Sequence, residues 1–113
     1  MVSQQDQQLL AQAQMYQQQL QATIAQKDNI NFQMMEINKA IEEIEKIKGT
    51  KSIYKIVGPI LIKSEKAEVT KDLKSRQSAM ELQGKTLEKT EQKLKARFEE
   101  VSQKLSKVIN VDK

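Results

Sequence analysis

Apolar residues recur at alternating steps of three and four residues through the first part of this 113-residue chain. Nine of the twelve positions in this series are apolar, and the spacing holds for more than five heptads. The positions are Leu9, Ala13, Tyr16, Leu20, Thr23, Lys27, Ile30, Met34, Ile37, Ile41, Ile44 and Lys48. Because this spacing keeps one face of an α-helix apolar, it is typical of the contact seam of a coiled coil. The sequence therefore predicts a long helix over about residues 5–48.

Short-range signals mark both ends of this helix. Ser3 precedes Asp6 by three residues, a spacing at which a hydroxyl and an acid can accept from the free N–H groups of a first turn. At the other end, Lys46 and Lys48 are expected in the last turn, where cations suit the helix dipole. Gly49 follows them and can adopt the left-handed conformation that ends a helix.

A second seam begins after about residue 67 and continues to about residue 109. Six apolar residues are spaced seven apart: Leu73, Met80, Leu87, Leu94, Val101 and Val108. The positions between them change along the helix, because Gln77, Gly84 and Glu91 are poor core residues whereas Phe98 and Leu105 are good ones. We therefore expect a second long helix whose seam is fuller toward the C-terminus.

Between the helices, two runs of β-branched and apolar residues flank Gly58-Pro59. This pattern predicts a β-hairpin over about residues 52–64. A two-stranded hairpin alone is marginal in water, so we expect strands of other subunits to complete the sheet. The residues expected in this assembly hairpin are Ile53, Tyr54, Ile56, Val57, Gly58, Ile60, Leu61 and Ile62.

The predicted fold class is mainly α, an antiparallel two-helix coiled coil with a short central β-hairpin, in one domain over residues 1–113. Each helix would be about 65 Å long at ~1.5 Å per residue, and nearly equal helices joined by a compact insert fold back on each other. Facing positions then have numbers adding to about 115, which places Lys27 near Glu88. Lys27 either fixes this register at some cost in stability or extends from a solvated seam into water.

This register brings the two chain ends together, away from the hairpin. The apolar residues expected at this tip are Val2, Leu9, Leu10, Met15, Leu105, Val108, Ile109 and Val111. Two helices cannot bury all of them, and apolar groups diluted by glutamines suit weak contact with many partners. Ordinary fraying of helix ends is the alternative interpretation of the same residues.

Composition excludes several classes of function. The chain has no cysteine and no histidine, so thiolate and imidazole catalysis and soft metal ligands are excluded, and no metal or cofactor is expected. Paired carboxylates on adjacent helix positions diverge and have no pocket, so we do not expect an enzyme. The net charge of +4 is spread along the chain and no apolar run could span a membrane, so neither nucleic acid nor membrane is an expected partner. The expected location is the cytoplasm.

The hairpin motif and its flanks resemble a known family. The run Tyr54–Gly58, the run Ile60–Lys63 and the Leu-Glu-Lys-x-Glu pattern from Leu87 to Glu91 are similar to the β-class subunit of archaeal prefoldin, as is the stretch Glu65–Leu73 that leads into the second helix. A single hairpin favours the β class, because α-class subunits resemble this plan with two hairpins.

The resemblance implies a hetero-hexamer of two α-class and four β-class subunits whose hairpins form a double β-barrel. It further implies an ATP-independent chaperone that holds unfolded client proteins at the distal coiled-coil tips and passes them to a group II chaperonin. A structural coiled-coil adaptor or tether with one dedicated partner is the alternative function. That alternative requires a seam that stays apolar, and the second helix is interrupted at Gln77, Gly84 and Glu91.

Overall fold

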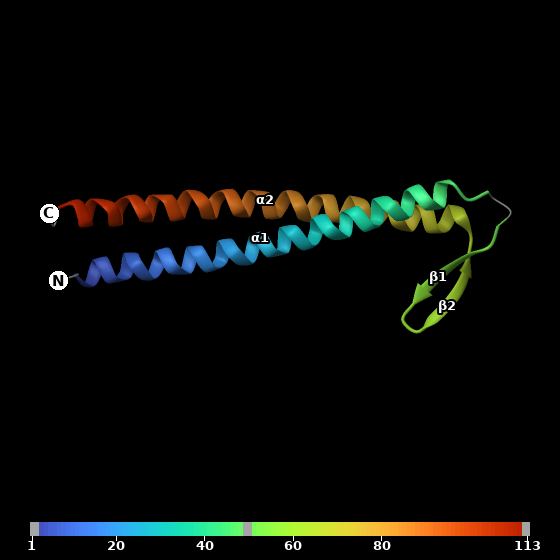
Figure 1. Ribbon diagram of the computed structural model, residues 1–113, viewed down its shortest axis with the longest axis horizontal. Helices are drawn as coiled ribbons and strands as arrows, with labels where there is room; N and C mark the ends of the chain where they lie inside the picture. Colours follow the sequence, from blue (N-terminus) through green and yellow to red (C-terminus); the bar gives the residue numbers. More distant parts are fainter. Residues whose placement is uncertain (1–2, 49–50, 112–113) are drawn as a thin grey trace. The chain divides into compact units, whose positions relative to one another are not determined.

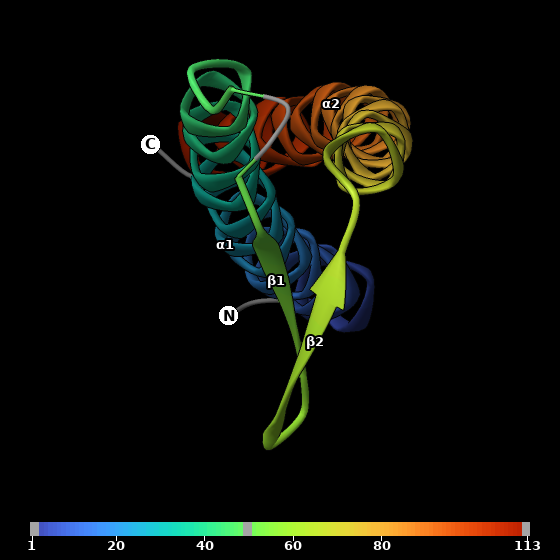
Figure 2. The same ribbon diagram turned by 90° about the vertical axis from the view of Figure 1, so that its right-hand side faces the viewer.

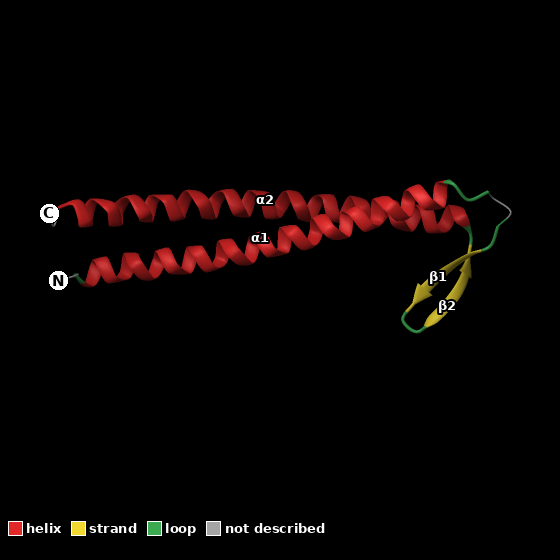
Figure 3. Ribbon diagram, viewed as in Figure 1, coloured by secondary structure: helices red, strands yellow, loops and turns green. Residues whose placement is uncertain are grey.

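Two long helices and one hairpin make up the fold. The computed structural model describes residues 3–48 and 51–111, without the side chains of residues 109–111. The elements follow in the order α1 (Gln4–Glu45), β1 (Ile53–Val57), β2 (Ile60–Ser64) and α2 (Lys66–Val111) (Figures 1 and 3). The helices are antiparallel and the hairpin connects them, so the predicted class is confirmed: mainly α with a central β-hairpin.

The start of α1 is the capping pair that the sequence predicted. The Ser3 hydroxyl oxygen accepts a hydrogen bond from the backbone N–H of Asp6 at 3.1 Å, and the Asp6 carboxylate accepts from the N–H of Ser3 at 3.3 Å. Each side chain thus satisfies a backbone donor that the first turn leaves free.

The end of α1 differs from the prediction. The helix ends at Glu45 and its last turn holds no basic residue, so Lys46 and Lys48 follow the helix, and Gly49 lies outside the described residues. The cation at this end comes from α2. The Lys66 ammonium lies 2.8 Å from the carbonyl oxygen of Ile47 and 3.5 Å from that of Glu45, where it bonds carbonyls that the helix end leaves free.

The hairpin turns over two residues, Gly58 and Pro59. Strands β1 and β2 pair antiparallel, with Ile53 opposite Ser64 and Val57 opposite Ile60 (Figure 2). Gly58 has a φ of 59°, and the ring of Pro59 fixes a negative φ. A positive φ followed by a negative one is the pattern of a type II′ turn, whose twist matches that of paired strands.

The chain divides into two compact units. The terminal unit comprises Met1–Asp28 and Lys85–Lys113, and the hairpin unit comprises Asn29–Gly84. Each unit contains a stretch of both helices. One register relates the helices in each: Lys27 pairs with Glu88 in the terminal unit, as predicted, and the Gln77 amide donates to the Asn38 side-chain oxygen at 2.7 Å in the hairpin unit. Both pairs of residue numbers add to 115.

The cores of both units are thin. Ala13, Leu94 and Val101 are buried in the terminal unit and Ile44 in the hairpin unit, all at seam positions. Most other seam positions are half-buried. The chain exposes 9128 Å², whereas a compact protein of its mass would expose about 6,300 Å². Within the described residues no third layer covers the two helices, so apolar surface stays exposed.

Gly84 lies inside α2, where its effect on the stability of the chain can be measured. A Cβ at this position would meet the Ile30 Cγ2 atom at 3.8 Å, an ordinary contact. We expect Gly84→Ala to stabilise the chain by about 1 kcal/mol, because alanine is the better helix former and no neighbour must move. Thermal unfolding followed by circular dichroism measures the effect. Gly58→Ala is the matched control and should destabilise, because its positive φ disfavours a side chain.

Candidate functional site

The hairpin is the largest group of exposed apolar side chains among the described residues. Tyr54, Ile56, Val57, Ile60, Leu61 and Ile62 are exposed, Ile56 to 74%, and Ile53 is half-buried. The register places Ile56 beside Leu61 on one face and Val57 beside Ile60 on the other. Both faces are therefore apolar, and the part of the chain that the structure describes contains no third strand.

An ion pair ties the hairpin to α2. The Lys55 ammonium, on the middle residue of β1, lies 2.8 Å from the Asp72 carboxylate. The Arg76 guanidinium approaches the same carboxylate at 3.9 Å from the next turn of α2. The hydrogen bond and charge of Lys55, with a smaller contribution from Arg76, lower the pKa of the Asp72 carboxyl. The ionised form of Asp72 is therefore the one that the Lys55 contact favours.

The predicted tip residues divide into three groups. Leu10 and Met15 are exposed, to 50% and 45%. Leu9, Leu105 and Val108 are half-buried on the seam. Val2 and the side chains of Ile109 and Val111 lie outside the described residues. Among the tip residues that the structure describes, the exposed apolar ones thus lie on α1, on positions beside the seam.

Sequence reasoning missed a second exposed group in the hairpin unit. Phe32 and Met35 are 60% and 69% exposed, one turn apart on the outer face of α1, and Leu82 is exposed on α2. The heptad pattern contained the signal, because none of the three falls on a seam position. Apolar side chains at outward positions mark a surface that the two helices do not cover.

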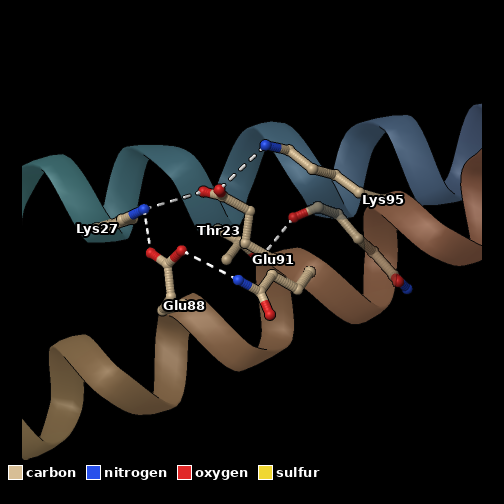
Figure 4. A network of polar contacts seen from close by, with 7 residues as sticks. Thr23, Lys27, Glu88, Glu91 and Lys95 are labelled. Atoms are coloured by element: carbon tan, nitrogen blue, oxygen red, sulfur yellow. Dashed lines mark hydrogen bonds and ion pairs between the residues drawn. The ribbon is translucent and has the colours of Figure 1, made fainter.

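A charged network interrupts the seam of the terminal unit (Figure 4). Lys27 of α1 pairs with Glu88 of α2 and lies 3.6 Å from the Glu91 carboxylate, which Lys95 approaches at 3.3 Å. Glu91 is only 7% exposed. Beside it, the buried Thr23 hydroxyl donates to the carbonyl oxygen of Gln19 at 2.8 Å. Lys27 thus engages charges of the opposite helix from its seam position.

The pKa values in this network follow from the pairing. The hydrogen bond from Lys27 lowers the pKa of the Glu88 carboxyl, and the same bond raises the pKa of the Lys27 ammonium despite some desolvation. The contribution of Glu88 to stability is therefore present above its unfolded pKa of about 4.3 and is lost as the pH falls through its lower folded pKa.

We expect Lys27→Leu with Glu91→Leu to raise the melting temperature by about 3–8 °C at pH 7, because an apolar pair replaces desolvated charges. Losing the Lys27 bond also returns Glu88 toward its ordinary pKa. Between about pH 5 and pH 3 the variant should therefore lose less stability than the wild type. Thermal scans across this range, with light scattering for the association state, test the register hypothesis. Unchanged melting and association for this variant and for Lys27→Leu alone would contradict it.

Metal sites and membrane spans are absent from the described residues. Within residues 3–48 and 51–111, no cluster of three or more carboxylates could hold a metal ion. Neither helix, over its described length, is long and apolar enough to cross a membrane.

Comparison with known proteins gives consistent matches over nearly the whole chain. The family model described as prefoldin subunit matches residues 7–110. Prefoldin subunit beta of Archaeoglobus fulgidus is 40% identical over 104 residues, which cover 92% of this chain and 90% of that protein. Prefoldin subunit beta of Pyrococcus furiosus is 37% identical over 97 residues, covering 86% and 83%.

A solved structure agrees with these matches. The crystal structure of the prefoldin beta subunit from Thermococcus strain KS-1 superposes with a TM-score of 0.87 at 30% sequence identity, and the alignment covers 96% of this chain and 95% of that one. The match includes the hairpin and both helices.

Proposed function

Because the chain belongs to the prefoldin family, in its β class, we propose that it is one of four β-class subunits that assemble with two α-class subunits into a hexamer. The family consists of chaperone subunits without enzymatic activity, as the lack of histidine, cysteine and a carboxylate pocket led us to expect. The finer proposal concerns how this chain assembles, what it holds and where.

The exposed hairpin is the observation that carries the proposal. Its strands present apolar side chains on both faces, and their outer edges pair with no other described segment, a combination that other strands would stabilise. We assign it to a β-barrel built from the hairpins of neighbouring subunits, with the whole chain, residues 1–113, acting as a single prefoldin domain.

The paired helix ends are proposed to hold unfolded client proteins. Leu10 and Met15 are exposed between uncharged glutamines, and methionine adapts to differently shaped apolar segments. Holding of this kind needs no nucleotide. The client would then pass to a group II chaperonin in the cytoplasm.

Two measurements test this function. Light scattering of the chain with an α-class partner should give the mass of a hexamer, and the complex should suppress aggregation of several unrelated denatured proteins without nucleotide. A chain that stays monomeric with and without the partner would overturn the proposal. A hexamer that protects none of the clients would favour the structural adaptor instead.

A further inference from the structure

The contact between Lys55 and Asp72 has a particular place in the hairpin unit. It joins the middle residue of β1 to the second turn of α2. Both side chains are about two-fifths exposed, so the bond forms at the rim of the unit and not in its core. It therefore adds little burial and mainly fixes where β1 lies relative to α2.

A hollow of about 380 Å³ lies beside this ion pair. Ala40 of α1 and Val69 and Leu73 of α2 line it with apolar side chains, and Tyr54 and Ile56 line it from β1. Lys55, Asp72 and Arg76 provide the charged part of its lining. The hollow thus has a lining in which apolar side chains outnumber charged ones, and Ile56, which belongs to this lining, is also exposed.

The turn end of the hairpin has the chemistry that such a hollow accepts. Val57, Gly58, Pro59 and Ile60 carry no charge, and both lysines of the hairpin strands lie farther from the turn. An uncharged, β-branched end fits an apolar hollow without leaving a charge unpaired.

We propose that the Lys55–Asp72 ion pair sets the position of β1 so that the hollow beside it receives the uncharged end of a hairpin from a neighbouring prefoldin subunit. This inference rests on the proposed assembly. It adds the residues that position β1 and the hollow that contacts the neighbouring subunit. Lys55 and Asp72 act by orienting β1, and Ala40 of α1, which lines the hollow, contacts the neighbour.

The first test uses the complete complex with the α-class partner. Asp72→Asn should raise the concentration at which half the complex dissociates by about tenfold. The exchange Lys55→Asp with Asp72→Lys should recover most of this loss, because the pair is restored with opposite sense. Glu100→Gln, which removes an exposed ion pair with Lys104 on α2, is the control and should leave dissociation unchanged.

The second test fills the hollow. Ala40→Phe should weaken assembly, because the phenyl ring would fill part of the hollow that the neighbouring hairpin occupies. Circular dichroism should show unchanged helix content. If Ala40→Phe or Asp72→Asn assembles as the wild type does, the inference is wrong while the proposed function stands. If the wild type itself does not assemble, the proposed function fails.

Discussion

Replacing Ile56 and Ile62 by aspartate should abolish the prefoldin complex and leave a folded, monomeric chain. Both side chains are exposed, so the substitutions remove little packing within the chain. They lie on opposite faces of the hairpin, since Ile56 pairs with Leu61 and Ile62 with Lys55. In an apolar barrel each carboxylate would lose its hydration without a partner, at a cost of several kcal/mol. Light scattering with the α-class partner measures the loss.

A matched variant tests whether the loss of assembly is specific to the hairpin or follows from charging any exposed apolar surface. Phe32→Asp with Met35→Asp places the same two charges on apolar positions of α1 that are also exposed, and it should still assemble. Circular dichroism must show that both variants keep their helices. A hexamer formed by the hairpin variant would contradict the assembly role of this segment.

The features that the sequence predicted well are local or periodic. The heptad series located the seam, because apolar side chains repeated every three or four residues can only share one helix face. The Ser3–Asp6 cap depends on residues three apart and forms as expected. The Lys27–Glu88 pair followed from the same periodicity once the helices were taken as antiparallel.

The features that the sequence did not predict depend on contacts between the hairpin and the helices. Lys66 reaches the end of α1 across the hairpin, so no spacing within α1 could indicate it. Lys55 and Asp72 lie 17 residues apart in the chain and meet only in the folded hairpin unit, and an alternating strand pattern does not determine such a contact. Phe32 and Met35 are different, because the heptad pattern places both off the seam and so indicates their outward positions.

Phe32 and Met35 provide a control for the test of client holding at the helix ends. Deleting residues 1–10 with those after Ser106 should leave assembly intact and weaken protection of clients, yet a deletion also removes helix. Leu10→Ser with Met15→Ser is the finer change, because both side chains are exposed and lie off the seam. We expect the amount of complex needed for half-suppression of aggregation to rise by about tenfold, since the four coils formed by this chain lose contacts at once.

The control for this result is Phe32→Ser with Met35→Ser, which removes more exposed apolar surface from the hairpin unit. If clients are held at the helix ends, this control should protect them as the wild type does. Equal loss in the two variants would mean that clients bind any exposed apolar side chain of α1. Full protection by both the tip variant and the deletion would overturn holding at the tip, since Leu10 and Met15 are its exposed apolar residues among those that the structure describes.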